Sequence, residues 1–345
     1  MSKRPTLAAV AAAAGVSTAT VDRVLNSRLP VRKATALRVI AAAEGIGYHG
    51  AALMRDRMSE RAELRTLGFC LQKRADPFYI ALGREVSAAA ARRTQSQCVA
   101  VVEYMDVLEP AAIAAQLLAL GREVEAIAVV AVDHPHVTAA IDTLHAEGKP
   151  VFALLSDLSA AQRAGFIGVD PRKAGRTAAW AISRLAHGGG GAVGVFVGSH
   201  RYLGQETCEI SFRSYLREHA PGFKVLDTQV NLEDTQLAYE ATLAMLARNA
   251  DLAGIYVAGG GVGGIIRALR EESQPGRIVT VCNELMPDRR DALIDGVIDL
   301  VIGTPLPRVA EAAVNAMLHA LDPAALPRVA DQLMLPFELF TPENV

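Results

Sequence analysis

The first 26 residues carry apolar positions at the spacing of short helices. Leu7, Val10, Ala11 and Ala14 fall at i, i+3, i+4 and i+7, so they share one face of a helix. The hydroxyl of the preceding threonine can cap that helix, because it can accept a bond from an otherwise unpaired backbone N–H. Gly15 then supplies the backbone freedom for a tight turn.

A second helix is predicted directly after this turn. Ser17 can cap it, and Val21 and Val24 point inward. Its outward positions are Thr18, Ala19 and Arg23. This spacing predicts a helix-turn-helix, whose second helix enters the major groove with its first residues facing base edges. Among them, Arg23 has the forked side chain that can bind a guanine.

A third helix is predicted at Val31–Glu44, and Tyr48 closes the small core. Residues 49–65 can form a short amphipathic helix but have little to pack against, so they are interpreted as a linker.

From Thr66 onward, strand-like runs alternate with helical ones. The expected strands are 67–71, 97–104, 126–132, 150–155, 164–170, 192–198, 252–259, 277–283 and 300–305, with 223–230 extended. The expected helices are 80–92, 110–120, 136–147, 173–186, 210–218, 235–247, 263–272, 287–295 and 307–321. This alternation predicts parallel sheets covered on both faces. About nine such units suit two sheets, with a ligand cleft beyond the carboxyl ends of the strands.

Composition describes a globular protein of two or three units. The 345 residues are 51% hydrophobic and 21% charged. No apolar run is long enough to span a bilayer, and the start MSKRPT lacks the apolar segment of a secretory signal, so no membrane association is expected. The four cysteines lie far apart without a C-x-x-C pair, which fits the reducing cytoplasm.

Charge is distributed unevenly along the chain. Residues 1–60 carry nine Lys and Arg against four acids, a net charge of +5. The whole chain carries −2, so residues 61–345 carry −7. A basic head on an acidic body is the electrostatic pattern expected of a nucleic-acid-binding module joined to a body with another task.

At this point the residues resemble a known family. The stretch TLAAVAAAAGVSTATVDRVLN at 6–26, followed by Val31, Thr35, Val39 and Tyr48, resembles the DNA-binding head of the lactose-repressor (LacI) family. The body resembles the family's effector domain, which is shared with periplasmic sugar-binding proteins. The matching segments there are DPFY (76–79), GVD (168–170), AGRTAA (174–179), YVAGGGVGGIIRAL (256–269) and NELMPDRRDALIDGVIDLVIG (283–303).

The resemblance implies an α plus α/β fold. A three-helix helix-turn-helix head at 1–50 and a hinge at 51–65 precede an effector domain at 66–345 of the two-lobed, type I periplasmic-binding-protein kind. Its N-lobe is expected at about 66–164 and 304–327, and its C-lobe at about 165–303 and 328–345. The resemblance also implies a homodimer that reads a pseudo-palindromic, double-stranded operator, and a small effector in the cleft.

The family pattern assigns DNA contacts by position. Thr18, Ala19 and Arg23 would read bases, and Thr6, Ser17, Thr20 and Asn26 would meet phosphates. The hinge segment Ala51–Met58 departs from the family, because Gly50 and Ala51 replace Pro-Asn and Arg57 replaces the leucine that wedges into the minor groove. Two interpretations stay open. Either Leu53, Met54 or Met58 wedges, or Arg55 and Arg57 bind the groove, which attracts positive charge.

The effector site also departs from the family. Asp76, Phe78, Tyr79 and Glu284 suit a sugar ring and its hydroxyls, but Ala258 and Thr304 stand where Asn and Gln are often found, and Cys208 lies near an expected Arg. Loop residues beyond strand ends are further candidates. These are Asp133, His134, His200 and Arg201. The expected effector is a sugar, polyol or sugar acid other than a plain hexose held in the usual way.

Other motifs point to no chemistry of their own. GGGVGG at 259–264 contains G-x-G-x-x-G, with Glu284 twenty residues beyond, as in dinucleotide-binding proteins. It comes late in the domain, so a tight turn beside the ligand is the preferred interpretation. No nucleophile–base pair and no metal-ligand set is evident. The sequence therefore predicts an effector-responsive repressor without catalytic activity, metal or cofactor. The alternatives are a sugar-binding protein with no role on DNA and an NAD-linked enzyme.

Overall fold

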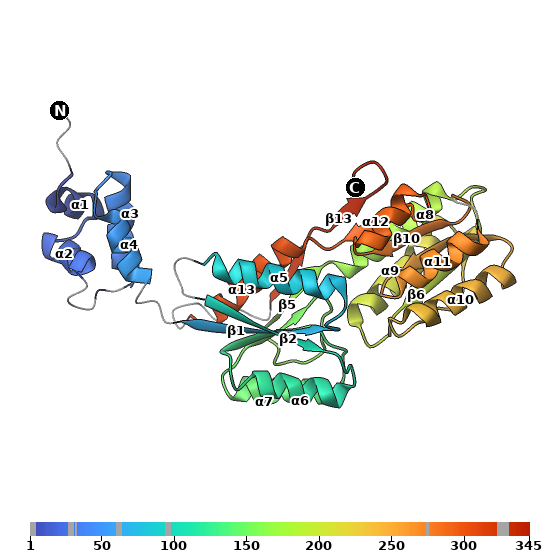
Figure 1. Ribbon diagram of the computed structural model, residues 1–345, viewed down its shortest axis with the longest axis horizontal. Helices are drawn as coiled ribbons and strands as arrows, with labels where there is room; N and C mark the ends of the chain where they lie inside the picture. The colour runs from blue at the N-terminus through green and yellow to red at the C-terminus, as the bar shows by residue number, and fades with distance from the viewer. Residues whose placement is uncertain are drawn as a thin grey trace. The chain divides into compact units, whose positions relative to one another are not determined.

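The computed structural model describes residues 5–26, 31, 33–59, 64–93, 98–273, 276–322 and 331–345. It divides into two compact units, one of Met1–Arg65 with Ala91–Val99 and the other of Thr66–Ala90 with Ala100–Val345. The first unit is essentially the helical head and the second is the α/β body (Figure 1). Among the described residues, no single helix is long and apolar enough to cross a membrane.

The head contains four helices. They are α1 (Leu7–Ala14), α2 (Thr18–Asn26), α3 (Lys33–Gly45) and α4 (Ala51–Ser59). The helices α1 and α2 are bent by 109° at their junction, which is the geometry of a helix-turn-helix. Gly15 ends α1 with φ +62°, a conformation that few other residues adopt at low cost.

The fourth helix belongs to the head's core. Ala51 and Met54 are buried in one cluster with Val10, Val39 and Tyr48. The expectation that residues 49–65 have little to pack against is therefore wrong for the first turn of α4. The physical reason is that Gly50 brings the chain back over Tyr48, so α4 begins against the exposed edge of the three-helix core.

The first lobe of the body is a six-stranded sheet in the order β12-β5-β4-β3-β1-β2. Its strands are β1 (Arg65–Gln72), β2 (Cys98–Met105), β3 (Ala126–Val129), β4 (Val151–Leu154), β5 (Gly165–Val169) and β12 (Asp331–Leu335). The helices α5 (Pro77–Ala91) and α13 (Leu306–Ala320) cover one face, and α6 (Pro110–Leu120) and α7 (Pro135–Ala146) cover the other (Figure 1). Apolar side chains of α6 and α7 pack on β3 and β4 to form the core of that face.

The second lobe is a seven-stranded sheet in the order β13-β11-β10-β9-β6-β7, with β8 also paired to β6. Its strands are β6 (Gly191–Val197), β7 (Phe223–Val225), β8 (Gln229–Val230), β9 (Leu252–Val257), β10 (Val279–Asn283), β11 (Leu300–Gly303) and β13 (Glu338–Phe340). Only the β11–β13 pairing is antiparallel among those that the structure describes in this sheet.

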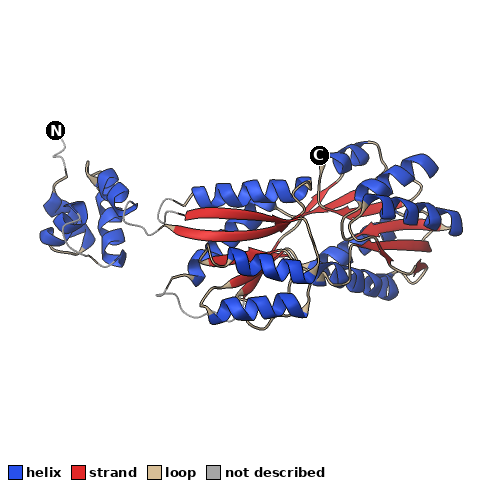
Figure 2. Ribbon diagram, turned by 60° about the horizontal axis from the view of Figure 1, so that its bottom comes forward, coloured by secondary structure: helices blue, strands red, loops and turns tan. Residues whose placement is uncertain are grey.

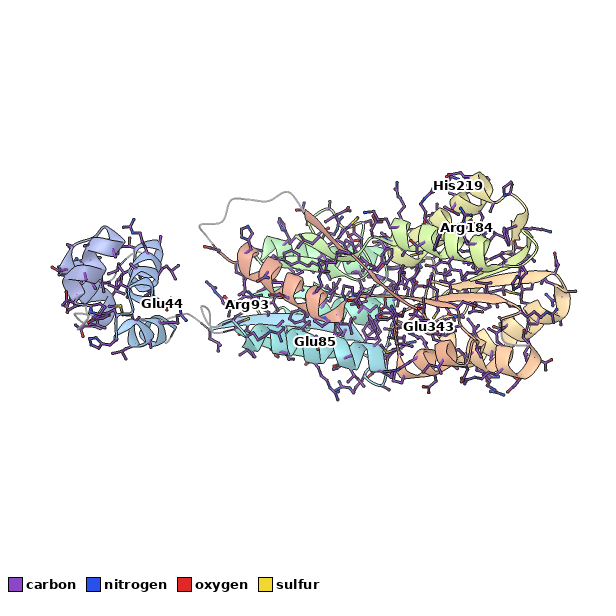
Figure 3. The ribbon with its side chains drawn as sticks, turned by 90° about the horizontal axis from the view of Figure 1, so that it is seen from above. Glu44, Glu85, Arg93, Arg184, His219 and Glu343 are labelled. Carbon is purple, nitrogen blue, oxygen red and sulfur yellow. The ribbon has the colours of Figure 1, made fainter. Side chains whose placement is uncertain are left out.

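Helices enclose this second sheet as well. One layer consists of α8 (Pro171–Leu185) and α9 (Leu203–His219), and the other of α10 (Thr235–Arg248), α11 (Val262–Glu272) and α12 (Pro287–Ile294). Figure 2 shows the strands of both lobes between their helices. In Figure 3, Arg184 on α8 and His219 on α9 lie at the same end of their layer. Two sheets enclosed by helices confirm the fold class predicted from sequence.

The expected boundaries between the lobes are wrong for two strands. The residues of β5 and β12 are expected in the C-lobe (165–303 and 328–345), but both strands belong to the first sheet. The reason is pairing: Phe166 lies opposite Ala153 of β4 and Gln332 of β12. The expected helix 210–218 begins earlier, at Leu203, because its polar first turns face the cleft rather than the core.

The packing of α4 leads to a stability prediction. Met54 is fully buried, whereas its neighbour Leu53 is 46% exposed. Met54→Ala should destabilise the head by about 2–5 kcal/mol, the usual cost of emptying such a core position. Hydrogen exchange of peptides from α1 to α4 in the full-length protein measures this loss of stability, and exchange should be faster in Met54→Ala. Leu53→Ala is the matched control and should exchange at the natural rate. Equal exchange in the two variants would contradict the packing of α4.

Candidate functional site

The predicted base-reading residues lie on the free face of α2. Thr18, Ala19 and Arg23 are exposed, whereas Val21 and Val24 on the opposite face are buried. A helix-turn-helix uses this arrangement, because the buried face fixes the helix on the head while the exposed face enters the groove. The exposed and buried side chains of α2 therefore lie on the faces that the sequence spacing predicts.

The hydroxyls expected near phosphates also serve as helix caps. The Thr6 hydroxyl accepts a bond from the Ala9 N–H at 3.4 Å, and the Ser17 hydroxyl accepts one from the Thr20 N–H at 3.2 Å. Asn26 donates to Asp22 Oδ1 at 2.6 Å at the other end of α2. These residues hold the ends of α1 and α2 in place, and helix starts of this kind are also where DNA phosphates bind.

The packing of α4 shows which side chains of the hinge segment are free to contact DNA. The Met54 side chain fills the head core, so it is not available to wedge into DNA in this conformation, while Leu53 is exposed. Arg55 forms an ion pair with Glu44 of α3. The side chains of Arg57 and Met58 lie outside the described residues.

A pocket lies between the two lobes of the body, at the carboxyl ends of both sheets. It encloses about 1000 Å³ of empty space, including its opening. Five of the predicted effector residues line it. These are Asp76, Phe78, Tyr79, Glu284 and Thr304. Because strands of a parallel sheet end at one edge, loops after β1, β10 and β11 meet here, as expected for an open α/β sheet. We call this space the inner pocket.

Glu284 and Thr304 form a closed pair on the wall of the inner pocket. The Thr304 hydroxyl donates to Glu284 Oε1 at 2.6 Å, and the Thr304 N–H donates to Oε2 at 3.0 Å. Burial raises the pKa of Glu284, although the bonds from Thr304 oppose this effect. Glu284 also adopts φ +66°, a strained conformation for a residue with a side chain. Such strain is found mostly at functional sites.

A second polar network comes from residues that sequence reasoning missed. Gln205 on α9 accepts from the Gly198 N–H at 2.7 Å and donates to Glu233 Oε1 at 2.7 Å. The same Glu233 oxygen accepts from the Gly260 N–H at 3.2 Å. Gln205 and Glu233 both line the inner pocket. Their positions after β6 and β8 are the one sequence signal that could have identified them, because ligand groups gather at strand ends.

Hydrogen bonds join the two lobes beside the inner pocket. Gln72 of β1, which is fully buried, accepts from the hydroxyls of Tyr79 at 3.3 Å and of Tyr202 at 3.1 Å. Tyr202 comes from the second lobe yet packs in the core of the first. Lys73 donates to the Glu233 carbonyl at 3.1 Å. Burial raises the pKa values of both tyrosines, so their hydroxyls stay neutral donors.

Arg289 supplies the positive charge of the inner pocket. Its Nη1 donates to the carbonyls of Asn283 at 3.3 Å and Glu284 at 2.7 Å. Its Nε is buried and has no hydrogen-bond partner among the described residues. A ligand acceptor at this point would satisfy that N–H, which is otherwise costly to leave unpaired.

Four other predicted effector residues do not line the inner pocket. The Asp133 carboxylate accepts bonds from the Ser159 N–H and hydroxyl, both at 2.9 Å. His200 pairs with Glu209 at 3.0 Å. His134 and Arg201 line a different space between the lobes. The sequence placed all four correctly after strands, but it could not show which strands flank the inner pocket.

The glycines of the GGGVGG motif form the pocket wall and a tight helix contact. A Cβ atom on Gly259 would lie 2.7 Å from Gln205 Oε1, and one on Gly264 would lie 1.9 Å from the Thr235 carbonyl of α10. Packing of α11 on α10 and room beside Gln205 therefore explain these glycines without a dinucleotide. Within the described residues, no cluster of His, Cys, Asp and Glu could hold a metal ion.

The Glu284–Thr304 pair leads to a pH prediction. Because its pKa is raised in the folded state, the stability that protonated Glu284 contributes is complete below the unfolded value near 4.3. It is lost as pH rises through the folded pKa. The melting temperature of Glu284→Gln minus that of the natural protein should therefore increase as the pH is raised from 4.5 to 8. Glu272→Gln, at an exposed position, controls for the loss of one carboxylate. If the melting temperatures of Glu284→Gln and the natural protein change with pH by the same amount, the prediction is contradicted.

Family comparisons agree with this architecture. Residues 6–50 match bacterial regulatory proteins of the lacI family, and residues 67–324 match the periplasmic binding protein domain. The HTH-type transcriptional regulator MalR of Streptomyces coelicolor is 30% identical over 200 residues. That alignment covers 57% of this chain and 55% of MalR, so the match spans about half the length of the curated relative.

Solved structures share the fold of the body. A solute binding protein of an ABC transporter from Agrobacterium vitis, bound with alpha-D-tagatopyranose, superposes with a TM-score of 0.73 at 21% identity, over 81% of this chain and 95% of that chain. The glucose-galactose binding protein GanP of Geobacillus stearothermophilus gives 0.73 at 15% identity, over 82% and 99%. The head, the two-lobed body and both family matches lead to one conclusion: this chain belongs to the periplasmic binding protein domain family through its body and carries a lacI-family helix-turn-helix domain as its head.

Proposed function

We propose that this protein is a repressor whose affinity for its operator is changed by a small effector in the inner pocket. The observation that carries the proposal is the presence, in one chain, of an exposed reading helix α2 and a polar pocket between two lobes. Family membership supports both halves. The two heads of a homodimer would read the two halves of a pseudo-palindromic operator, since dimers of this motif bind half-sites one helical turn apart.

The regulatory mechanism follows from linkage. The inner pocket has walls from both lobes, so a ligand that bridges Asp76 of one lobe and Glu284 of the other favours one lobe arrangement. If that arrangement differs in its affinity for operator, ligand and operator must alter each other's binding by the same factor. Residues 51–65 would carry the change to the heads.

The chemistry of the inner pocket supports a polyhydroxylated effector: a sugar, polyol or sugar acid. Phe78 and Tyr79 offer ring faces, while Gln205, Glu233 and Asn283 offer amide and carboxylate groups that can pair with hydroxyls. The A. vitis protein of similar fold binds a sugar ring. Arg289 would suit an acceptor oxygen on the effector.

A sugar-binding protein without a role on DNA is the alternative. The basic head, with its net charge of +5 on residues 1–60, and the exposed face of α2 favour the regulator. A gel shift with the promoter next to the protein's own gene distinguishes the two hypotheses. The regulator should shift that promoter at concentrations that leave unrelated DNA of equal length unbound.

Arg23→Ala tests the reading helix. It should cost about 1–3 kcal/mol at one base position of the operator, because a bidentate contact to a base is lost, and discrimination at that position should relax. Binding to an operator and to its single-base variants, measured at fixed salt concentration, checks this. Arg38→Ala removes the same charge from the exposed side of α3 and is the matched control. If both variants lose specific and non-specific binding equally, Arg23 does not read a base.

Gln205→Ala tests the inner pocket. A thermal-shift screen of sugars, polyols and sugar acids first identifies a stabilising ligand. The variant should bind that ligand about tenfold more weakly, because a hydrogen bond to a polar ligand contributes about 1–1.5 kcal/mol. His200→Gln changes a polar residue outside the pocket and should keep the natural affinity. If His200→Gln weakens binding of the ligand and Gln205→Ala does not, the effector does not bind in the inner pocket.

A further inference from the structure

A second pocket opens between the lobes. It encloses about 860 Å³ of empty space, including its opening, and shares Tyr202 and Glu233 with the inner pocket. Its walls come from the segments after β2, β3, β6 and β8. We call it the outer pocket. Nothing in the proposed effector mechanism uses it.

An arginine and a histidine from different lobes line the outer pocket together. The Asp133 N–H donates to the Arg201 carbonyl at 2.7 Å, and this bond between the lobes holds Arg201 beside His134. The Asp133 carboxylate accepts bonds from Ser159. Ion pairs between described residues include neither Arg201 nor His134. The guanidinium of Arg201 is therefore left without an ion-pair partner among the described residues.

The ring of His134 is oriented for donation. Its Nδ1 accepts a bond from the His136 N–H at 3.2 Å, so the second ring nitrogen is left to donate. Desolvation and the charge of Arg201 lower the pKa of His134, so its imidazole is a neutral donor beside the Arg201 guanidinium. A negatively charged group between them can accept bonds from both side chains.

Two helices begin at the outer pocket. The helix α6 begins at Pro110 and α9 begins just after Tyr202, and both residues line the pocket. The N-cap residue of α6 makes no side-chain cap bond, and the N–H groups of such a first turn favour negative charge. The start of α9 contributes less, because the Gly204 N–H donates to Ser156 Oγ at 3.1 Å.

Much of the remaining wall is apolar. Leu108, Pro110 and Val132 come from the first lobe, and Leu232 comes from the second, where it is 64% exposed with φ +52°. Glu233 also lines the pocket, and its Oε1 accepts bonds from Gln205 and the Gly260 N–H. The pocket thus combines a cationic end with an apolar side.

We propose that the outer pocket binds a small organic oxyanion, with its phosphate or carboxylate group between Arg201 and His134 and its apolar part against Leu232. The site uses the Arg201 guanidinium of one lobe and the His134 imidazole N–H of the other, so an occupied pocket holds the lobes in the arrangement seen here. This site goes beyond the effector proposal and does not depend on it.

Calorimetric titration of the full-length protein with phenyl phosphate tests the site. Saturable binding is expected, weaker binding with inorganic phosphate, and none with phenol, which has the ring but not the charge. Arg201→Gln should weaken phenyl phosphate binding at least tenfold, and His134→Gln about threefold. Arg201→Lys keeps the charge and should retain most of the affinity, which separates loss of the site from loss of folding.

Arg172→Gln is the matched control, because it removes an exposed arginine from α8 of the same lobe. Phosphate attracted to the basic head contributes equally to Arg201→Gln and Arg172→Gln, so the difference between them reports the outer pocket. Equal affinities in these two variants, or no saturable binding of phenyl phosphate, would overturn the proposal. Operator binding without added anion is measured separately on Arg201→Gln, so failure of the regulator proposal appears in that gel shift alone.

Discussion

The parallel pairing of strands in each lobe is the constraint on which both pockets depend. Parallel strands end at one edge of a sheet, so the loops that leave them gather there. In this body, two such edges are joined by hydrogen bonds from Tyr202 to Gln72 and from Lys73 to the Glu233 carbonyl. The Gln72 amide has partners within the first lobe, Tyr79 and the Val130 carbonyl, and the bond from Tyr202 is the one that requires the lobes to stay together. The loops at these two edges therefore supply the polar walls of the cleft and also hold the lobes close together.

Sequence periodicity predicted most elements of the body and the fold class, but it did not predict the strands β12 and β13. In the body, alternating strand-like and helical runs predicted two covered sheets, because burial on both faces leaves a strong apolar signal at every strand. The lobe boundaries were less accessible. Strands β5 and β12 are short and apolar like the strands of either sheet, and only their pairing with β4 and with each other assigns them.

The candidate site was predicted in part, and the limit has a physical cause. Asp76, Phe78, Tyr79, Glu284 and Thr304 line the inner pocket as the family resemblance implied. Position after a strand does not tell which neighbours a loop will meet, so Asp133 and His200 were equally good candidates until their partners Ser159 and Glu209 were seen. Gln205 and Glu233 were missed because their roles depend on a contact between residues 28 positions apart.

The last fifteen residues belong to both lobes at once. The strand β12 pairs with β5 at the border of the first sheet, and β13 pairs with β11 at the border of the second. A single cleavage before Asp331 would strip a protecting strand from each sheet and leave two rows of unpaired backbone groups, which are templates for association with other chains. Loss of this tail would therefore favour aggregation through the two exposed sheet edges, although neither pocket loses a lining residue.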